Sequence, residues 1–253
     1  MINISQTLID PPTLRSQLRL NETQDKILER MSASRFVFSY DSLQQLMFEL
    51  KLRNDIVETA KALDRSGARF ASFDKSRCNK AYWNLTDFGG FQLRYGVQPS
   101  AAILDIFRNG SKYAFECSTA IIIVYYRAVL QSLGTQAFNQ LFPDILLFDS
   151  QYSPELGLTA LTISETDVLP GDVLYFDNPD YHPATPEWRG ENVVYLGNGS
   201  FYGHGIGITG AQQMIDYLNM LRKPGAQRSA YLMDLIVRPD FASLARFSTA
   251  PTS

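Results

Sequence analysis

The chain has 253 residues, with 23 Lys or Arg and 26 Asp or Glu, so its net charge is −3 at pH 7. Such a balance gives no general attraction to nucleic acid or to an anionic membrane, and we expect neither as a partner. The length allows one large core, and no Pro/Gly/Ser-rich stretch divides the sequence. We therefore predict a single domain over residues 1–253, in which residues 1–40 form an N-terminal arm and a short helix.

The first residues, MINISQTLIDPPTL, lack the basic and apolar regions of a secretory signal, so we expect a protein that is not secreted. Cys78 and Cys117 are the two cysteines, and we predict that both are free thiols. The two histidines, His182 and His204, stand in no metal-ligand spacing with them. With no glycine-rich nucleotide loop either, we expect neither a metal nor a cofactor.

The N-terminal third is predicted to be an extended arm followed by two helices. Pro11-Pro12 is expected to break any early helix, and a short helix is predicted near Glu22–Met31. Asp41 or Ser42 can cap a long helix whose apolar residues recur at helical spacing as far as Gly67. Its charged face is expected to be solvated.

The next segments are short. Residues 82–95 have two strand-like halves around Gly89-Gly90, which predicts a hairpin. Residues 100–110 follow Pro99 and have the spacing of a short helix that stops at Asn-Gly. We interpret the aromatic residues of this region as packing residues; they are Phe70, Phe73, Tyr82 and Trp83.

The segment around which the chain is organised runs from Ala114 to Gly134, AFECSTAIIIVYYRAVLQSLG. Its apolar character on nearly every side predicts a buried helix ending at Gly134, with Cys117 in the first turn. A helix N-terminus lowers a thiol pKa, which would favour a nucleophile. A buried core thiol is the alternative reading. The polar neighbours Glu116 and Ser118 favour an end of the helix that meets solvent or a substrate.

The second half of the chain is predicted to be mainly antiparallel strands. Residues 144–149 form a strand or short helix, and the polar residues 150–162 are expected to be irregular. Three strands follow in PGDVLYFDNP, ENVVYLG and SFYGHGIGI, the last two joined by a tight turn at Asn198-Gly199. Residues 211–225 are predicted to be an amphipathic helix, and residues 227–241 a last strand-like segment.

These elements define an α+β fold in which a central helix carrying the cysteine packs on an antiparallel sheet. FECSTA, PGDVLYF and ENVVYLGNGSFYGH resemble, in the same order, the nucleophile motif, the following strand and the hairpin of the NlpC/P60 superfamily. The resemblance implies a papain-like core with an N-terminal helical extension. It also puts Glu191 where the superfamily has its catalytic histidine, with His204 near the later polar position.

A narrower resemblance covers the chain from about Tyr40 onward. KYAFECSTAIIIVYY, WRGENVVYLG, FYGHGIGI and RKPGAQRSAYL closely resemble the bacterial spore-coat transglutaminases, the Tgl-type protein-glutamine γ-glutamyltransferases. This implies Ca²⁺-independent acyl transfer: the cysteine attacks a glutamine carboxamide, ammonia leaves, and a lysine amine forms an isopeptide crosslink. The implied partners are glutamine- and lysine-bearing spore coat proteins. The implied location is the cytoplasm of the mother cell and then the spore coat, and we expect a monomer.

The resemblance also assigns the site residues. Cys117 would be the nucleophile, Glu191 its base with a pKa raised by burial, and Glu116 a second carboxylate that can assist. Without the resemblance, Glu191 would be read as an exposed charge at a strand end. For His204 the alternatives are a packed residue that orients a neighbour and a direct proton donor.

A thioester must be shielded from water while it waits for an amine. The resemblance implies an aromatic tunnel, to which Phe70, Trp188 and Asn192 would belong. Ser150 stands where the family has another aromatic residue, so one entrance is expected to be wider, with Tyr152 a candidate cover. Two other functions stay open: an amide hydrolase acting on peptidoglycan peptides, and an inactive structural protein of the coat.

Overall fold

The computed structural model describes residues 1–248, so residues 249–253 of the predicted domain lie outside the described part. The helices are α1 (Pro11–Gln17), α2 (Glu22–Ala33), α3 (Leu43–Asp64), α4 (Pro99–Arg108), α5 (Cys117–Leu133), α6 (Thr135–Leu141), α7 (Ala211–Met220) and α8 (Phe241–Ala245). The first eight strands are β1 (Ile2–Ile4), β2 (Thr7–Ile9), β3 (Phe38–Tyr40), β4 (Arg69–Phe70), β5 (Trp83–Leu85), β6 (Phe91–Leu93), β7 (Ala114–Phe115) and β8 (Leu146–Leu147). The others are β9 (Thr159–Thr162), β10 (Val173–Asp177), β11 (Gly190–Gly197), β12 (Ser200–Gly203), β13 (Gly207–Gly210) and β14 (Tyr231–Arg238). The mixed α+β class is confirmed.

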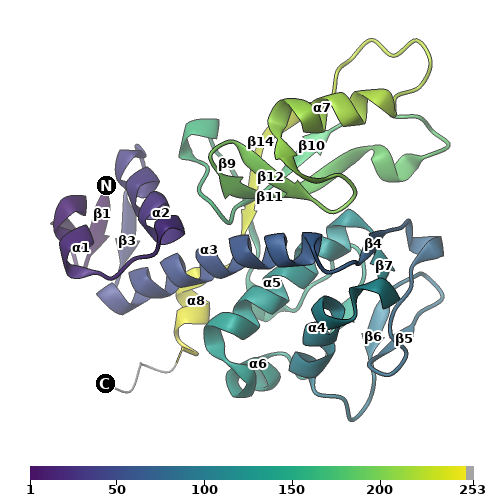
Figure 1. Cartoon of the computed structure of the whole chain (residues 1–253). Coiled ribbons are helices and arrows are strands. Elements are labelled where there is room, and N and C mark those ends of the chain that lie inside the picture. The colour runs from purple at the N-terminus through teal and green to yellow at the C-terminus, as the bar shows by residue number, and fades with distance from the viewer. Residues whose placement is uncertain (249–253) are drawn as a thin grey trace.

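Figure 1 shows α3 running lengthwise through the molecule, with the main sheet on one side of it and α4, α5 and α6 on the other. The N-terminal elements gather at the first end of α3, where they form a small apolar cluster with it; its members include Ile2, Ile27, Met31 and Leu46. Apolar residues of α3 thus take part in two cores, the main one and a smaller N-terminal one.

The main sheet has six antiparallel strands in the order β13-β12-β11-β10-β14-β9. The hairpin between β11 and β12 turns at Asn198 and Gly199, whose φ angles are +53° and +70°, as the Asn-Gly pair predicts. One face packs through Val173 and Val194 on the core around α5, and the other is partly covered by α7. Every described helix is too short or too polar to cross a membrane.

Helix α5 lies in the main core, as predicted from its continuous apolar sequence. Side chains on all its faces are buried, from Cys117 to Leu133, and Gly134 ends it with a φ of +84°. The residues just before it, Ala114 and Phe115, form a short parallel pairing with Arg69 and Phe70. This pairing brings β4 beside the N-terminal end of the helix.

Four local predictions are wrong. The charged face of α3 is not solvated, because Glu49, Arg53 and Asp55 are buried and are satisfied by ion pairs and hydrogen bonds. Pro11 begins α1, because a proline is tolerated in the first turn, where its missing N–H has no helical partner. Thr159–Thr162 is the edge strand β9 and is fully exposed, so no apolar alternation marks it in the sequence. The segment SFYGHGIGI is two strands, because the chain turns back after Gly203.

Candidate active site

Cys117 is the first residue of α5, and its side chain is only 2% exposed. Glu116 is the N-cap and accepts hydrogen bonds from the backbone N–H and the hydroxyl of Ser118 at 2.8 and 2.6 Å. The Cys117 thiol donates to Oε1 of Glu116 at 3.3 Å, and Nδ2 of Asn192 donates to Sγ at 3.4 Å. The thiol thus lies between a carboxylate of its own segment and an amide of strand β11.

Glu191, on β11, is completely buried. Its Oε1 accepts a hydrogen bond from the backbone N–H of Gly205 at 3.2 Å, and its Oε2 has no hydrogen-bond partner in residues 1–248. Burial raises the pKa of Glu191 from 4.5 to about 8, and the Cys117 thiol and the Gly205 N–H act in the opposite direction. The expectation of a buried carboxylate with a raised pKa is confirmed, and the exposed strand-end reading is wrong.

The pKa of the Cys117 thiol is raised well above its usual value of 9.0, first by burial and then by the charges of Glu191 and Glu116. The prediction of a thiol pKa lowered by the helix N-terminus is therefore wrong. The helix end does favour a thiolate, but burial and two carboxylates outweigh it. Such a thiol needs a base to remove its proton before it can attack a carbonyl carbon.

His204 is half-buried and stacks on Phe115, with ring centroids 4.5 Å apart and planes at 12°. Its Nδ1 shares a 2.9 Å hydrogen bond with the hydroxyl of Tyr202. Burial lowers its pKa from 6.5 to about 4, so the imidazole is neutral at pH 7. Its backbone N–H interacts with Glu191 and lowers that carboxyl's pKa. The geometry matches a packed residue that positions its neighbour.

Phe70 and Trp188 form an aromatic pair with ring centroids 4.7 Å apart. The pair lies against Gly205, where an added β-carbon would stand 2.7 Å from the Trp188 ring, and the N–H of Gly205 binds Glu191. The pair is therefore on the Glu191 side of the site. Neither ring lines the cavity that reaches Cys117, whereas Asn192, the other predicted tunnel residue, does.

A cavity of about 340 Å³ opens over Cys117, on the Glu116 side of the thiol. Its walls come from distant segments: Phe73, Glu116, Cys117, Ser118, Asp149, Ser150, Tyr175, Glu187, Arg189, Gly190 and Asn192. Ser150, which stands where the family has an aromatic residue, lines this cavity. Tyr152 does not; it is 40% exposed and donates a hydrogen bond to the carbonyl of Leu158. Tyr152 therefore does not cover the entrance that Ser150 leaves wider.

Sequence reasoning missed several wall residues of this cavity. Tyr175 pairs with Asn192 across β10 and β11, and the strand motif PGDVLYF contained it without singling it out. Glu187 and Arg189 flank Trp188 in PEWRGEN, which was the available signal. Asp149 stands next to Ser150 in a loop, and no sequence pattern marked it as a wall residue.

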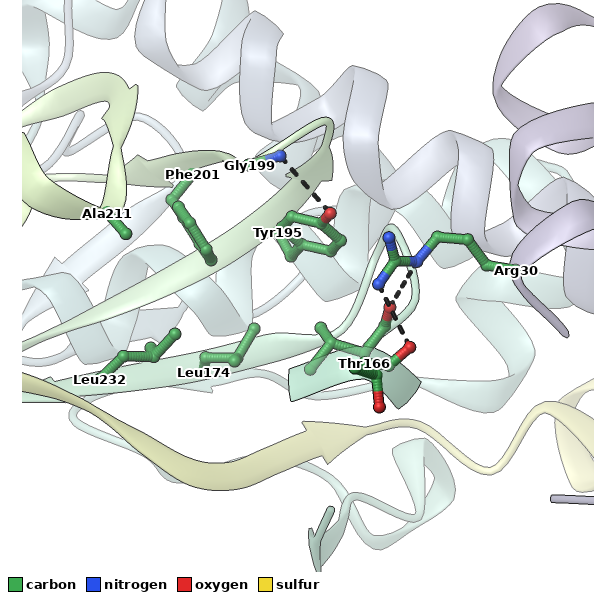
Figure 2. A pocket seen from close by; sticks show the side chains of 9 residues that line it. Arg30, Thr166, Leu174, Tyr195, Gly199, Phe201, Ala211 and Leu232 are labelled. Carbon is green, nitrogen blue, oxygen red and sulfur yellow. Dashed lines mark hydrogen bonds between the residues drawn. The ribbon is translucent and has the colours of Figure 1, made fainter. Parts of the chain in front are cut away.

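A second cavity, of about 440 Å³, lies on the α7 side of the main sheet (Figure 2). Leu174, Phe201 and Leu232 supply its apolar walls, and Arg30 reaches its edge to donate hydrogen bonds to the carbonyls of Val168 and Thr166. No cysteine, histidine or carboxylate is among its wall residues.

In residues 1–248, no group of three or more His, Cys, Asp or Glu side chains is placed to hold a metal ion. Cys78 and Cys117 are both free, as predicted, and burial raises the pKa of the Cys78 thiol to about 11. A buried cysteine at a helix N-terminus, flanked by two carboxylates beside an antiparallel sheet, is typical of thiol enzymes.

Comparison with known proteins narrows this class. A family model described as protein-glutamine gamma-glutamyltransferase matches residues 1–248, and the chain belongs to this family. The protein-glutamine gamma-glutamyltransferase of Halalkalibacterium halodurans is 47% identical over 228 residues, which are 90% of this chain and 80% of the relative. That of Bacillus subtilis (strain 168) is 42% identical over 246 residues, 97% of this chain and 99% of the relative.

A solved structure agrees. It is a transglutaminase from Geobacillus stearothermophilus, without its C-terminal extension, and it is 50% identical with a TM-score of 0.79. The match covers 83% of this chain and 99% of that one. The predicted family and enzyme class, an acyltransferase of the transglutaminase type, are confirmed.

Proposed function

We propose that the chain forms ε-(γ-glutamyl)lysine isopeptide crosslinks between proteins through a thioester on Cys117. One observation carries the proposal: the buried thiol lies between two carboxylates, and Glu191, whose pKa is about 8, can accept its proton. A general base works best when its pKa is near the working pH. Burial brings the pKa of this glutamate close to the working pH.

In the first step Glu191 takes the thiol proton as Sγ attacks the γ-carboxamide carbon of a glutamine side chain. The C–S bond forms, the C–N bond breaks, and the proton passes to the departing nitrogen, so that ammonia leaves. In the second step a neutral lysine amine attacks the thioester carbon. The new C–N bond forms, the C–S bond breaks, and a proton of the amine returns to sulfur through the carboxylate.

The neighbouring residues have supporting roles in this proposal. Glu116, hydrogen-bonded to the thiol, is the second carboxylate and can partly replace Glu191. The amide of Asn192 donates to Sγ and stabilises negative charge that develops on sulfur. His204 positions the segment that binds Glu191, and Phe70 with Trp188 excludes water from that side.

We also propose a finer fold class and a cellular role for the chain. The helix carrying the cysteine and the antiparallel sheet support a papain-like core of the NlpC/P60 type. The resemblance to spore-coat transglutaminases, together with relatives from Bacillus, supports coat proteins as the substrates. It also supports action in the mother cell and then in the spore coat, by a monomer that needs no metal.

The test compares five variants in the incorporation of a fluorescent amine into a glutamine-bearing protein. Cys117→Ala abolishes incorporation, because no other group can hold the acyl intermediate. Glu191→Gln lowers the rate by about 10²- to 10⁴-fold, the usual cost of losing a general base. If Glu116 substitutes, the single variant keeps measurable activity and only the variant that combines it with Glu116→Gln is silent. Full activity in both single glutamate variants and none in His204→Ala would assign the base to His204 instead.

A further inference from the structure

We propose that the cavity over Cys117 is the acceptor side of the site, and that Asp149 and Glu187 at its walls select a positively charged amine, the ammonium group of a lysine side chain. The inference rests on the proposed function and adds to it which face of the thiol the second substrate approaches. It also assigns roles to two residues outside the catalytic set.

The charges of the cavity walls support this assignment. Three carboxylates line the cavity, those of Glu116, Asp149 and Glu187, against the single guanidinium of Arg189. Within residues 1–248, neither Asp149 nor Glu187 forms an ion pair. Asp149 accepts one weak hydrogen bond, at 3.4 Å from the hydroxyl of Ser150. Their charges are therefore available to a ligand.

The reactive group lines this cavity. Cys117 is almost completely buried, and it lines this cavity together with Glu116. Beyond the thiol, Oε2 of Glu191 is buried without a partner in the described chain. A cation that enters the cavity therefore reaches the thiol beside the Glu116 carboxylate, which can remove the proton that an ammonium must lose before it attacks.

The two selecting carboxylates come from unrelated segments. Asp149 follows β8 and has a φ of +50°, a left-handed conformation that Asp and Asn adopt more readily than other side chains. Glu187 lies in the 3₁₀ turn Pro186–Trp188 that leads into β11. Both are half-buried, which weakens screening by salt relative to a fully exposed charge.

The glutamine donor gives these charges no comparable partner, because its carboxamide is neutral. A positively charged wall would repel an ammonium, and an apolar wall would require it to lose its hydration shell without compensation. The aromatic pair Phe70–Trp188, on the Glu191 side, carries no charge, so it attracts an ammonium less than two carboxylates do. The acidic cavity is thus the side that suits the cationic substrate.

The experiment compares two acceptors on one donor, dimethylated casein, whose lysines are blocked. n-Butylamine carries the ammonium of lysine on a four-carbon chain, and hydroxylamine is mainly uncharged at neutral pH. Each rate is normalised to the release of ammonia without any amine. For the combined variant Asp149→Asn, Glu187→Gln we expect the ratio of the butylamine KM to the hydroxylamine KM to rise about tenfold. Asn keeps the backbone conformation at position 149.

Two further variants separate charge from shape. Arg189→Gln removes the opposing charge, so the same ratio falls, by about threefold. Glu29→Gln removes an exposed carboxylate of α2, outside the cavity, and keeps the wild-type ratio. High salt raises the ratio of the wild type toward that of the combined variant.

An unchanged ratio in the combined variant overturns the inference, as does an equal rise of both KM values, which would mean that the residues only shape the site. If the wild type releases ammonia from the donor, either result leaves the proposed thioester chemistry standing. If it neither releases ammonia nor incorporates amine, the proposed function fails and the inference fails with it.

Discussion

Gly203 leaves open the space that the side chain of Glu191 occupies: a β-carbon at position 203 would lie 2.8 Å from Cγ of Glu191 and 2.9 Å from its Oε1. The two residues lie on the neighbouring strands β12 and β11. Gly203 does not have a positive φ, so an alanine could adopt its backbone conformation. Position 203 therefore needs a glycine to leave room for the Glu191 side chain, and not to allow a special backbone conformation.

We therefore expect Gly203→Ala to displace Glu191 and lower amine incorporation by about 100-fold, since a displacement of about 1 Å can cost that much in catalysis. Gly210→Ala is the matched control, because the β-carbon there would meet the flexible end of Gln213. Rates are measured on both variants after circular dichroism confirms their folding. Equal rates in Gly203→Ala and the wild type would show that the carboxylate does not need its present position.

The second prediction concerns the pH dependence of stability. The pKa of Glu191 is about 8 in the folded protein and near 4.5 when unfolded, so the unfolded chain loses this proton first as the pH rises. This carboxyl therefore contributes stability below pH 4.5 that is lost progressively up to about pH 8. In that window the wild type should lose about 1.4 kcal/mol per pH unit relative to Glu191→Gln.

Urea denaturation of both proteins at successive pH values checks this. The difference in unfolding free energy should change between the two pKa values and become constant above about pH 8. Glu29→Gln, which removes an exposed carboxyl, serves as the control. Parallel profiles for the wild type and Glu191→Gln would contradict the raised pKa.

How much the sequence could predict depends on whether the signal was local. The apolar run of α5 and the glycine that ends it predicted the helix, because burial on every face leaves a continuous pattern. Edge strand β9 left no pattern, since both its faces are exposed. Cys117, Glu191 and Glu116 were identified by resemblance, and in the structure both carboxylates lie near the thiol, while their catalytic roles stay predictions. The direction of the thiol pKa was not predictable, because it depends on burial and on a carboxylate from a distant strand.

The third prediction concerns the exclusion of water. Trp188 packs on Phe70 and over Gly205, whose N–H binds Glu191, so Trp188→Ala opens the site next to the base. We expect the ratio of glutamine hydrolysis to amine transfer to rise, because water then competes for the thioester. Ammonia release and amine incorporation are measured together. Phe88→Ala removes an aromatic side chain that is 50% exposed elsewhere, and should leave the ratio alone. The same ratio in both variants would mean that Trp188 serves packing only.

The fourth prediction is that amine incorporation persists in excess EDTA. The chemistry proposed here uses a thiol and carboxylates, and residues 1–248 hold no cluster of three or more metal-binding side chains. Activity is measured with EDTA, and again after Ca²⁺ or Mg²⁺ is added in excess over it. Activity that disappears with EDTA and returns only with a divalent ion would contradict the proposal.

The last prediction concerns the connection between α3 and the main sheet. Arg53 is completely buried on α3 and forms ion pairs of 2.8 Å with Glu49 and with Asp172, just before β10. Removing one partner of a buried pair leaves an uncompensated charge, so Arg53→Met should lower the free energy of unfolding by about 3–5 kcal/mol. Lys26→Met breaks the exposed pair with Glu22 and should change stability little. Urea denaturation measures both variants, and similar losses in the two would show that the buried pair is not what holds α3 to this turn.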